Sequence, residues 1–418
     1  MNKDRWLWQG ALFCFILAGA TGLLYRTGMV APIPGGLSLD NLRHAHSHLM
    51  FFGWAVPLPM YLLWRRMARR HPDRAHLIRR LRTCIAWGLG LGLLSWPFFL
   101  LYGYRPVYLG GITLPLSVII SGAVMVSWYA FMAIWWKLRR GPGDRPGLLF
   151  MDSALLLLLV SSLGAWGVAL AQNLAPATPL LSKALTHFFL ACFAEGWVVL
   201  AALAVMAEAA ELRAWTRKRW LALPVTAIVL GAPLTFIYGI SEDLLSPLML
   251  GIGRLGGAVA GLGLLALCHG FWQRRGGFST LLLWPLAFLT LKGFMQLAAS
   301  VVPGDFLLAN HALRILYLHV LLLGAFTLAG AAALHLLRQA PYRSYDLLAG
   351  SVLAVLLSLL LLTPAVPAGW TGMWTFRVLA AAAALPVLAM MWIWALLARA
   401  TPGDVGKVPG QIIERKNR

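Results

Sequence analysis

The chain has 418 residues, of which 60% are hydrophobic and 12% are charged. A soluble domain is nearer half apolar and a quarter charged, so this composition excludes an ordinary soluble protein and indicates that lipid is the solvent. The formal net charge of +21 would suit a nucleic-acid-binding protein. However, the basic residues form short clusters between apolar runs and no basic domain is present, which excludes nucleic acid as a partner.

Apolar runs of about 20 to 28 residues follow one another along the chain, each long enough to cross a hydrocarbon core of about 30 Å as a helix. They are too long and too uniformly apolar for barrel strands, so helices are expected. The first run looks like a signal peptide, but no cleavage site followed by a soluble domain is found, so we interpret it as a retained helix. The predicted spans are 6–27, 43–64, 83–103, 113–136, 148–171, 183–210, 220–240, 248–273, 278–302, 309–337, 346–363 and 372–398.

The connections between these spans alternate in charge. The segments 65–82, 137–145, 213–219, 274–275, 338–343 and 399–418 are basic, whereas 28–42, 104–112, 172–182, 241–247, 303–308 and 364–371 are poor in Lys and Arg. The positive-inside rule places the basic set in the cytoplasm. The sequence therefore predicts an all-α polytopic membrane protein of about twelve transmembrane helices, with both termini cytoplasmic.

This topology sets the predicted domains and location. Residues 1–400 are expected to form a single transmembrane domain, and residues 401–418 a basic, disordered cytoplasmic tail. A multi-pass protein with no soluble domain fits a bacterial inner membrane, with the lipid bilayer as its first partner. Function must then reside within the bilayer or at its two faces.

Six of the ten histidines fall in the predicted outer half of the membrane: His44, His46, His48, His187, His311 and His319. Five of them open the second, sixth and tenth helices, which all run inward from the outer face, and His319 lies two turns deeper in the tenth. Neutral imidazole is the commonest metal ligand and a natural axial ligand for haem iron. Each histidine alone could equally be a helix-packing residue, but the set of six predicts a metal or cofactor site.

Helix geometry divides this set. His44 and His48 are four residues apart and share a face, whereas His46 points away from that face. His311 and His319 share a side of their helix but stand about 12 Å apart along its axis, too far apart to bind the same metal ion.

Other buried charges agree with a polar outer chamber, because ionisable groups inside a membrane are costly. Arg254, Lys292, Arg314 and Arg377 project to the outer half or the middle. They could pair with haem propionates or an anionic substrate, or simply reach the outer interface. Glu195 is the one carboxylate predicted deep in a span, and it could carry protons or pair with one of these cations.

Three runs resemble a known family. HAHSHLMFFGW at 44–54 resembles helix 2 of subunit I of the haem-copper oxidases, where a ligand His precedes a Gly by seven residues, here His46 and Gly53. YLHVLLLGAF at 317–326 resembles helix 10 of that subunit, and HFFLACFAEGW at 187–197 is similar to helix 6 of its small relatives. The resemblance implies that His46 and His319 bind a low-spin haem b and that Tyr317 stands at the position of the high-spin haem ligand.

The HxH and Phe-Gly of the second helix, with HAL at 311–313, also resemble the NnrS family of membrane haem-copper proteins linked to nitric oxide stress. The chain departs from the oxidases at span 220–240, which has no His where they carry a copper-binding His-His pair. With Tyr317 in place of a high-spin ligand, oxygen reduction is not expected, and whether the protein is an enzyme stays open. His44, His48, His187 and His311 could instead form an accessory copper or quinol site.

Four functional hypotheses remain. The first is a haem protein for electron transfer, served by a quinol or a redox partner protein; it would hold b-type haem, since no CxxCH motif exists for covalent attachment. The second is an NnrS-like protein with copper beside the haem. The third is a secondary transporter that uses the outer His, Arg and Glu residues for proton or solute coupling, although no inverted repeat or pair of broken helices supports it. The fourth is an assembly subunit of a respiratory complex.

Overall fold

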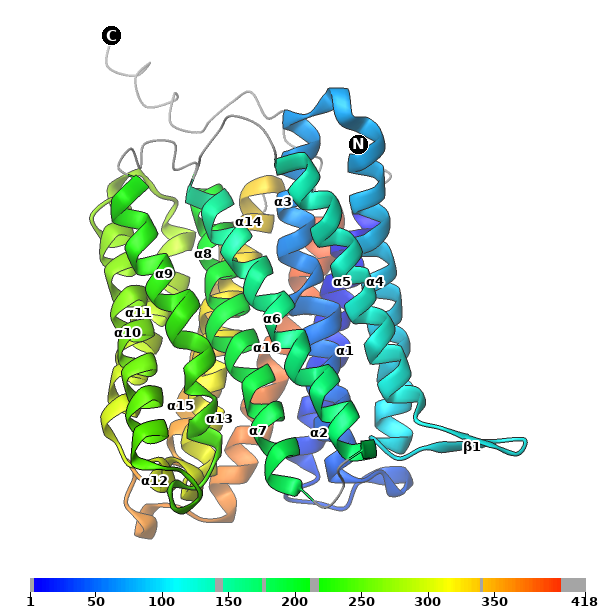
Figure 1. Ribbon diagram of the computed structural model, residues 1–418, viewed down its shortest axis with the longest axis vertical. Coiled ribbons are helices and arrows are strands. Elements are labelled where there is room, and N and C mark those ends of the chain that lie inside the picture. The colour runs from blue at the N-terminus through cyan, green and yellow to red at the C-terminus, as the bar shows by residue number, and fades with distance from the viewer. Residues whose placement is uncertain (1–3, 140–145, 175–177, 211–217, 339–340, 400–418) are drawn as a thin grey trace.

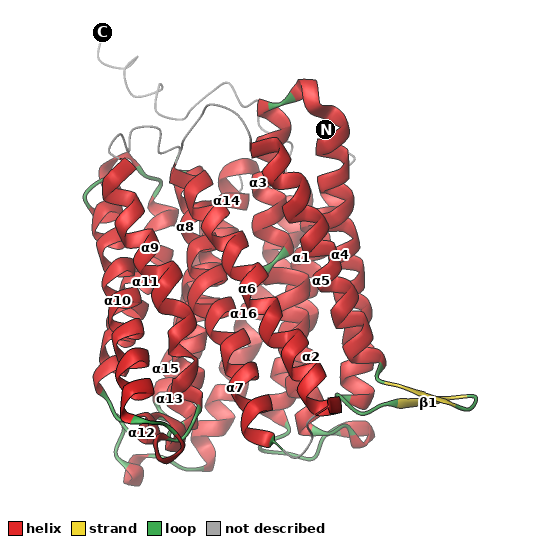
Figure 2. Cartoon of the chain, in the orientation of Figure 1, coloured by secondary structure: helices red, strands yellow, loops and turns green. Residues whose placement is uncertain are grey.

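The computed structural model describes residues 4–139, 146–174, 178–210, 218–338 and 341–399. Within these residues the chain is almost entirely helical (Figure 2), which confirms the all-α polytopic class. Eleven of the described helices are long and apolar enough to cross a membrane. The tail predicted at 401–418 lies outside the described residues.

In the part of the chain that the structure describes, nine helices surround a central group. They are α1 (Arg5–Thr27), α4 (Ala75–Tyr102), α5 (Leu116–Arg139), α6 (Pro146–Leu174), α9 (Lys218–Leu234), α10 (Pro247–Trp272), α11 (Leu283–Val301), α15 (Tyr342–Leu360) and α16 (Met373–Arg399). The connections between helices contain short helical turns: η2 (Pro34–Gly36), η4 (Pro72–Arg74), η6 (Thr235–Gly239), η7 (Glu242–Leu244), η8 (Arg275–Gly277), η9 (Thr280–Leu282), α12 (Gly304–Ala309) and η11 (Ala368–Trp370).

Three further segments, which we call the central trio, each consist of an α-helix, a π-helix and a second α-helix. They are α2 (Leu39–Leu49), η3 (Met50–Ala55) and α3 (Pro57–Arg70); α7 (Pro179–Leu190), η5 (Ala191–Val198) and α8 (Val199–Ala209); and α13 (His311–His319), η10 (Val320–Thr327) and α14 (Leu328–Arg338). The first contains the predicted span 43–64, which is helical but is divided at Val56, so it is not among the eleven uninterrupted helices.

The described helices group into three consecutive sets of four, with each segment of the central trio counted as one member. In each set the second member belongs to the central trio and packs against the first and third, as α2 does against α1 and α4. The sets close into a ring, because α5 contacts α6, α10 contacts α11, and α16 contacts α1. The central trio consequently contains the core: in the most apolar 18-residue stretches of the spans 179–209 and 311–337, 83% and 78% of the residues are buried, against 33–56% in the corresponding stretches of the other nine.

A glycine in each π-helix lets the first helix of its set approach closely. A Cβ added at Gly53 would lie 2.5 Å from Cys14 of α1, and one at Gly324 would lie 2.8 Å from Phe288 of α11. At Gly196 an added Cβ would overlap Leu157 of α6. The same close approach therefore recurs in all three sets, at the midpoint of the bundle, where small residues allow helices to pack.

Two indoles join the central trio at this level. Trp54 Nε1 of η3 donates to Thr327 Oγ1 of η10 at 3.0 Å, and Trp197 Nε1 of η5 donates to the Ala55 carbonyl of η3 at 3.2 Å. Both tryptophans are buried. A buried N–H without a partner is costly, so these bonds fix how the three helices meet.

The two ends of the bundle differ (Figure 1). We call one the hairpin end, because it carries α12 and the strands β1 (Val107–Leu109) and β2 (Ile112–Leu114), which pair antiparallel and turn at Gly110 and Gly111. At the other end, the basic end, α1 begins, α16 ends, and α3 meets α4. The charge pattern predicts that the hairpin end is external and the basic end cytoplasmic.

One predicted connection is largely helical. Residues 65–82 lie between two spans as expected, but α3 continues to Arg70 and α4 begins at Ala75. The charges that mark this segment as a connection do not oppose a helix, since Arg, Leu and Ala are good helix formers. Only the turn at Pro72–Arg74 interrupts the helices, where proline fits the first helical position.

Candidate functional site

His46 of α2 is turned toward α1. Its Nδ1 lies 2.7 Å from the Ala18 carbonyl oxygen, and a Cβ added at Gly22 would lie 2.7 Å from the same nitrogen. Gly22 thus makes room for the imidazole against the helix. A carbonyl oxygen can only accept, so Nδ1 carries the proton and Nε2 keeps its lone pair. Nε2 has no hydrogen-bond partner among the described residues.

His319 of α13 has the same arrangement. Its Nδ1 donates to the Ile315 carbonyl one turn earlier, at 2.8 Å, and its Nε2 has no partner in the described part of the chain. The His319 and His46 rings are near enough for their charges to interact, and Arg26 of α1 interacts electrostatically with both. The fold therefore brings together the two histidines that the sequence paired.

Metal-bound histidines almost always donate their second ring N–H to a carbonyl or carboxylate, which fixes the tautomer and aims the other nitrogen. His46 and His319 meet this requirement. Both rings are only partly buried although they lie in the central trio.

His335 of α14 provides the contrast. Its Nδ1 bonds the Ala331 carbonyl at 2.8 Å and its Nε2 lies 2.9 Å from Ser344 Oγ, so both nitrogens are engaged. Its side chain is buried at 1% exposure. His335 therefore packs as a structural residue on the same helical segment as His319.

His48 and His44 belong to an aromatic cluster at the hairpin end. His48 Nδ1 bonds the His44 carbonyl at 2.9 Å, and its Nε2 lies 3.1 Å from the Tyr104 hydroxyl. The His48 ring stacks on Phe99 with centroids 3.8 Å apart, and His44 meets Tyr104 edge to face at 4.7 Å. This confirms that His44 and His48 share a face that His46 does not. Both nitrogens of His48 are occupied, which makes it a packing residue in this structure.

The other two predicted ligands lie apart from this cluster. His187 of α7 packs against Gly239, where an added Cβ would overlap the ring. The exposed His311 accepts at Nδ1 from Arg314 Nη2 at 3.3 Å. The described residues contain no group of three or more His, Cys, Asp or Glu that could hold a metal ion. The copper site at His44, His48, His187 and His311 thus has no assembled ligand set here.

Positive charge collects around these histidines. Arg314 interacts electrostatically with His187 and His311, and Arg26 with His311 as well as with His46 and His319. Neither Arg26 nor Arg314 has a carboxylate within ion-pair distance among the described residues. A concentration of cations without matching acids favours an anionic ligand at this end.

A second polar cluster lies at the level of the π-helices. The Lys292 ammonium of α11 forms an ion pair with Glu195 of η5 and donates to Gln296 Oε1. Lys292 and Gln296 are 1% and 2% exposed. Tyr317 interacts with the Glu195 carboxyl, and its ring centroid lies 5.7 Å from the ammonium. Glu195 therefore pairs with a predicted cation, and Tyr317 is engaged in this pair.

The polar side chains continue toward the hairpin end. Ser300 Oγ donates to the Gln296 carbonyl at 2.9 Å, and the Tyr238 hydroxyl lies 3.4 Å from Ser300 Oγ. Farther out, Arg254 Nη2 donates to Glu242 Oε1 at 2.9 Å. Arg254 is thus an ion-pair residue. The fourth predicted cation, Arg377, is exposed on α16.

The sequence did not identify Ala18, Gly22, Arg26 or Gln296 as parts of these sites. Every residue has a backbone carbonyl, so the residue type at Ala18 does not show that its carbonyl accepts a hydrogen bond. Gly22 stands among other small residues of an apolar run. Arg26 could have been recognised, because it is an arginine at the predicted outer end of the first span, where the positive-inside rule disfavours it.

Neither a scan against protein-family models nor a search of the curated proteins finds a match to this chain. What the structure itself shows is a polytopic helical membrane protein whose two polar clusters both involve the central trio.

Proposed function

We propose that this protein is an integral membrane haem protein that binds one b-type haem between His46 and His319 and transfers electrons. One observation carries the proposal: two neighbouring imidazoles each have Nδ1 fixed by a backbone carbonyl and Nε2 free of any described partner. Haem iron takes two such nitrogens as axial ligands.

The surroundings support this cofactor. Arg26 and Arg314 could receive the two propionates, since no carboxylate in the described residues neutralises them. Bound iron would supply one-electron chemistry, and two axial imidazoles would leave it no open position for a gas. The chain would hold the rings in place through the Ala18 and Ile315 carbonyls.

A single haem is proposed because the residue at the position of a high-spin ligand is already engaged with other side chains. Tyr317, where the resemblance to the oxidases would place a high-spin ligand, interacts with the Glu195–Lys292 pair. No histidine lies in α9 or η6. A quinol or a redox partner protein would serve as electron donor, in a bacterial inner membrane. A role in nitric oxide or metal-related respiration would follow the NnrS resemblance.

The test begins with the full chain purified in mild detergent after expression with added haem. We expect a reduced-minus-oxidised spectrum with the α-band of a b-type cytochrome and about one haem per chain. His46→Ala and His319→Ala should each abolish that band, because a low-spin haem needs both axial nitrogens.

His335→Ala is the matched control, since it removes a buried histidine from the same segment as His319 and should leave the spectrum unchanged. Wild-type spectra from both His46→Ala and His319→Ala would show that the ligand assignment is wrong. Copper in stoichiometric amount on the same sample would favour the NnrS-like hypothesis.

A secondary transporter is the second candidate, and the buried Lys292–Glu195 pair favours it. Ionisable pairs within membrane spans commonly mark solute or proton pathways. Purified protein with no Soret band and no metal, despite haem supplementation, would support this candidate. Glu195→Gln would then be the first variant to compare with wild type for proton movement in liposomes.

A further inference from the structure

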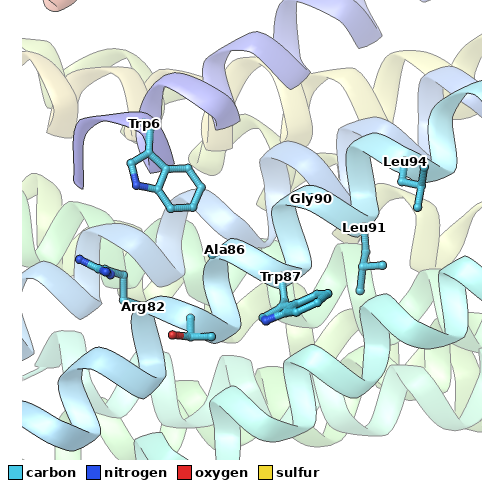
Figure 3. Close-up of a pocket in the computed structure, with 8 residues that line it drawn as sticks. Trp6, Arg82, Ala86, Trp87, Gly90, Leu91 and Leu94 are labelled. Carbon is cyan, nitrogen blue, oxygen red and sulfur yellow. The ribbon is translucent and has the colours of Figure 1, made fainter. Parts of the chain in front are cut away.

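A groove runs along the lipid-facing side of the bundle between α1 and α4, toward the basic end (Figure 3). Its volume is about 380 Å³, and it is lined by Trp6, Arg82, Thr83, Ala86, Trp87, Gly90, Leu91 and Leu94. Trp6 approaches from α1, and the other residues belong to α4. Neither the haem proposal nor the transporter alternative uses this feature.

The lining changes character along α4. Thr83, Ala86 and Gly90 of the lining recur at intervals of three or four residues and so share one face of the helix, which Arg79 continues one turn before the groove. The sequence along this face passes from guanidinium, through the indole of Trp87, to aliphatic side chains ending at Leu94. Charged, then aromatic, then apolar is the order in which a membrane leaflet itself is layered.

The length of the groove matches one leaflet. Thr83 and Leu94 are separated by about 16 Å at 1.5 Å per helical residue. Half of a hydrocarbon core of about 30 Å is about 15 Å. The apolar part of the groove therefore extends from the interface at the basic end to the middle of the bilayer.

The groove is open because the residues of α4 beneath it have small side chains or none. A Cβ added at Gly90 would meet no atom within 4 Å, and Ala86 is small. The walls remain open to the membrane: Trp6 is 47% exposed, Trp87 63% and Leu94 49%. Apolar side chains exposed along a hollow in a membrane span need an apolar chain to cover them.

The charge at the end of the groove nearest the basic end favours an anionic ligand. Arg79 and Arg80 are exposed, and Arg82, whose side chain is 39% exposed, bonds Asp4 Oδ1 at 2.7 Å. Arg82 is paired with Asp4, whereas Arg79 and Arg80, one turn earlier on α4, have no carboxylate partner among the described residues, which leaves a local excess of positive charge. Thr83 donates its hydroxyl proton to the Arg79 carbonyl, so the arginines provide the donors.

We propose that this groove is a binding site for one anionic phospholipid of the leaflet at the basic end. The phosphate lies beside the arginines, the glycerol region lies between Trp6 and Trp87, and an acyl chain runs over Gly90 to Leu94. The bound lipid covers the seam between the first and third helices of the first set. This inference does not depend on the haem.

The experiment measures lipid retained by the full chain after extensive washing in mild detergent, by native mass spectrometry with phosphatidylglycerol or phosphatidylcholine added as probes. Wild type should retain about one phosphatidylglycerol. Gly90→Leu fills the groove and should lose it. Gly350→Leu is the matched control, because Gly350 of α15 is also exposed with no atom within 4 Å of an added Cβ.

The headgroup is tested separately with Arg79→Gln and Arg80→Gln. Each substitution should weaken phosphatidylglycerol binding roughly fivefold, since a basic residue near an anionic lipid contributes about 1 kcal/mol. Equal retention by Gly90→Leu and Gly350→Leu would overturn the site. Equal retention of the two lipids by wild type, or a quinone retained in their place, would overturn the assignment to an anionic phospholipid.

Discussion

The central trio changes its packing at the π-helices. Toward the basic end, α8 buries every residue from Val199 to Ala207, and α14 is buried from Leu328 to His335. Toward the hairpin end, α7 has no fully buried residue and α13 has only Leu316. Two segments of the central trio are therefore closely packed in one half of the bundle and only partly buried in the other.

Charges follow the same division. At the basic end two ion pairs join packed helices: Arg66 of α3 pairs with Glu208 of α8, and Arg139 Nε lies 2.9 Å from Asp152 Oδ2. At the hairpin end, Arg26 and Arg314 lack a carboxylate partner among the described residues. Ion pairs between packed helices help to hold the fold in the first half, whereas two arginines without a carboxylate partner beside the histidines suit the second half to hold a ligand.

The π-helices mark the boundary. A π-helix shifts the register of a helix and often occurs at functional sites. Here each one lies between the histidine-bearing half and the packed half, and Glu195 lies in η5. The Glu195–Lys292 pair lies at this boundary, so it can belong either to the packed core or to the site.

The largest effect is expected from Lys292→Met. It leaves Glu195 buried without its cation, and breaking a buried ion pair on one side costs about 3–5 kcal/mol. The double variant Glu195→Leu with Lys292→Met should lose less stability than Lys292→Met alone, because no unpaired charge remains. The free energy of unfolding, measured by SDS titration in bicelles, checks both variants.

The same variants decide where the pair belongs. If it is part of the core, the double variant should fold and retain the haem spectrum. If the double variant lost as much stability as Glu195→Leu and Lys292→Met lose together as single variants, the side chains would not be coupled, contrary to the ion pair in the structure.

A smaller effect is expected where the halves meet. Gly196→Leu places a side chain against Leu157 of α6, and overpacking of this kind costs about 1–3 kcal/mol. Gly350→Leu, on an open helix face, should be neutral or slightly stabilising, since glycine is a poor helix former. Thermal unfolding of both variants gives the comparison. Equal stability of the two would mean that the close approach at η5 is not needed.

Sequence reasoning located most of the helices because length and hydropathy alone determine a membrane span. It also placed the six histidines in the half that the structure leaves open, and it separated His46 from His44 and His48 by helical periodicity. These inferences depend on local spacing, which a single sequence contains.

The threefold grouping was not recognised from sequence. The three sets share little beyond Gly53, Gly196 and Gly324, with a following tryptophan in two of them. In lipid, Leu, Val, Ala and Ile are nearly interchangeable, so the repeats can diverge without losing their packing. The carbonyls that fix His46 and His319 were equally hidden, because any residue supplies a carbonyl oxygen and only the fold selects which one is used.

The smallest effect distinguishes the histidines within the open half. Tyr104→Phe removes the hydroxyl from His48 Nε2 and keeps the ring that contacts His44 and Phe99. Loss of one such hydrogen bond should lower the free energy of unfolding by about 0.5–1.5 kcal/mol. The reduced haem spectrum should not change, since His48 is a packing residue. An altered α-band in Tyr104→Phe would instead place His48 among the iron ligands and remove the distinction between it and His46.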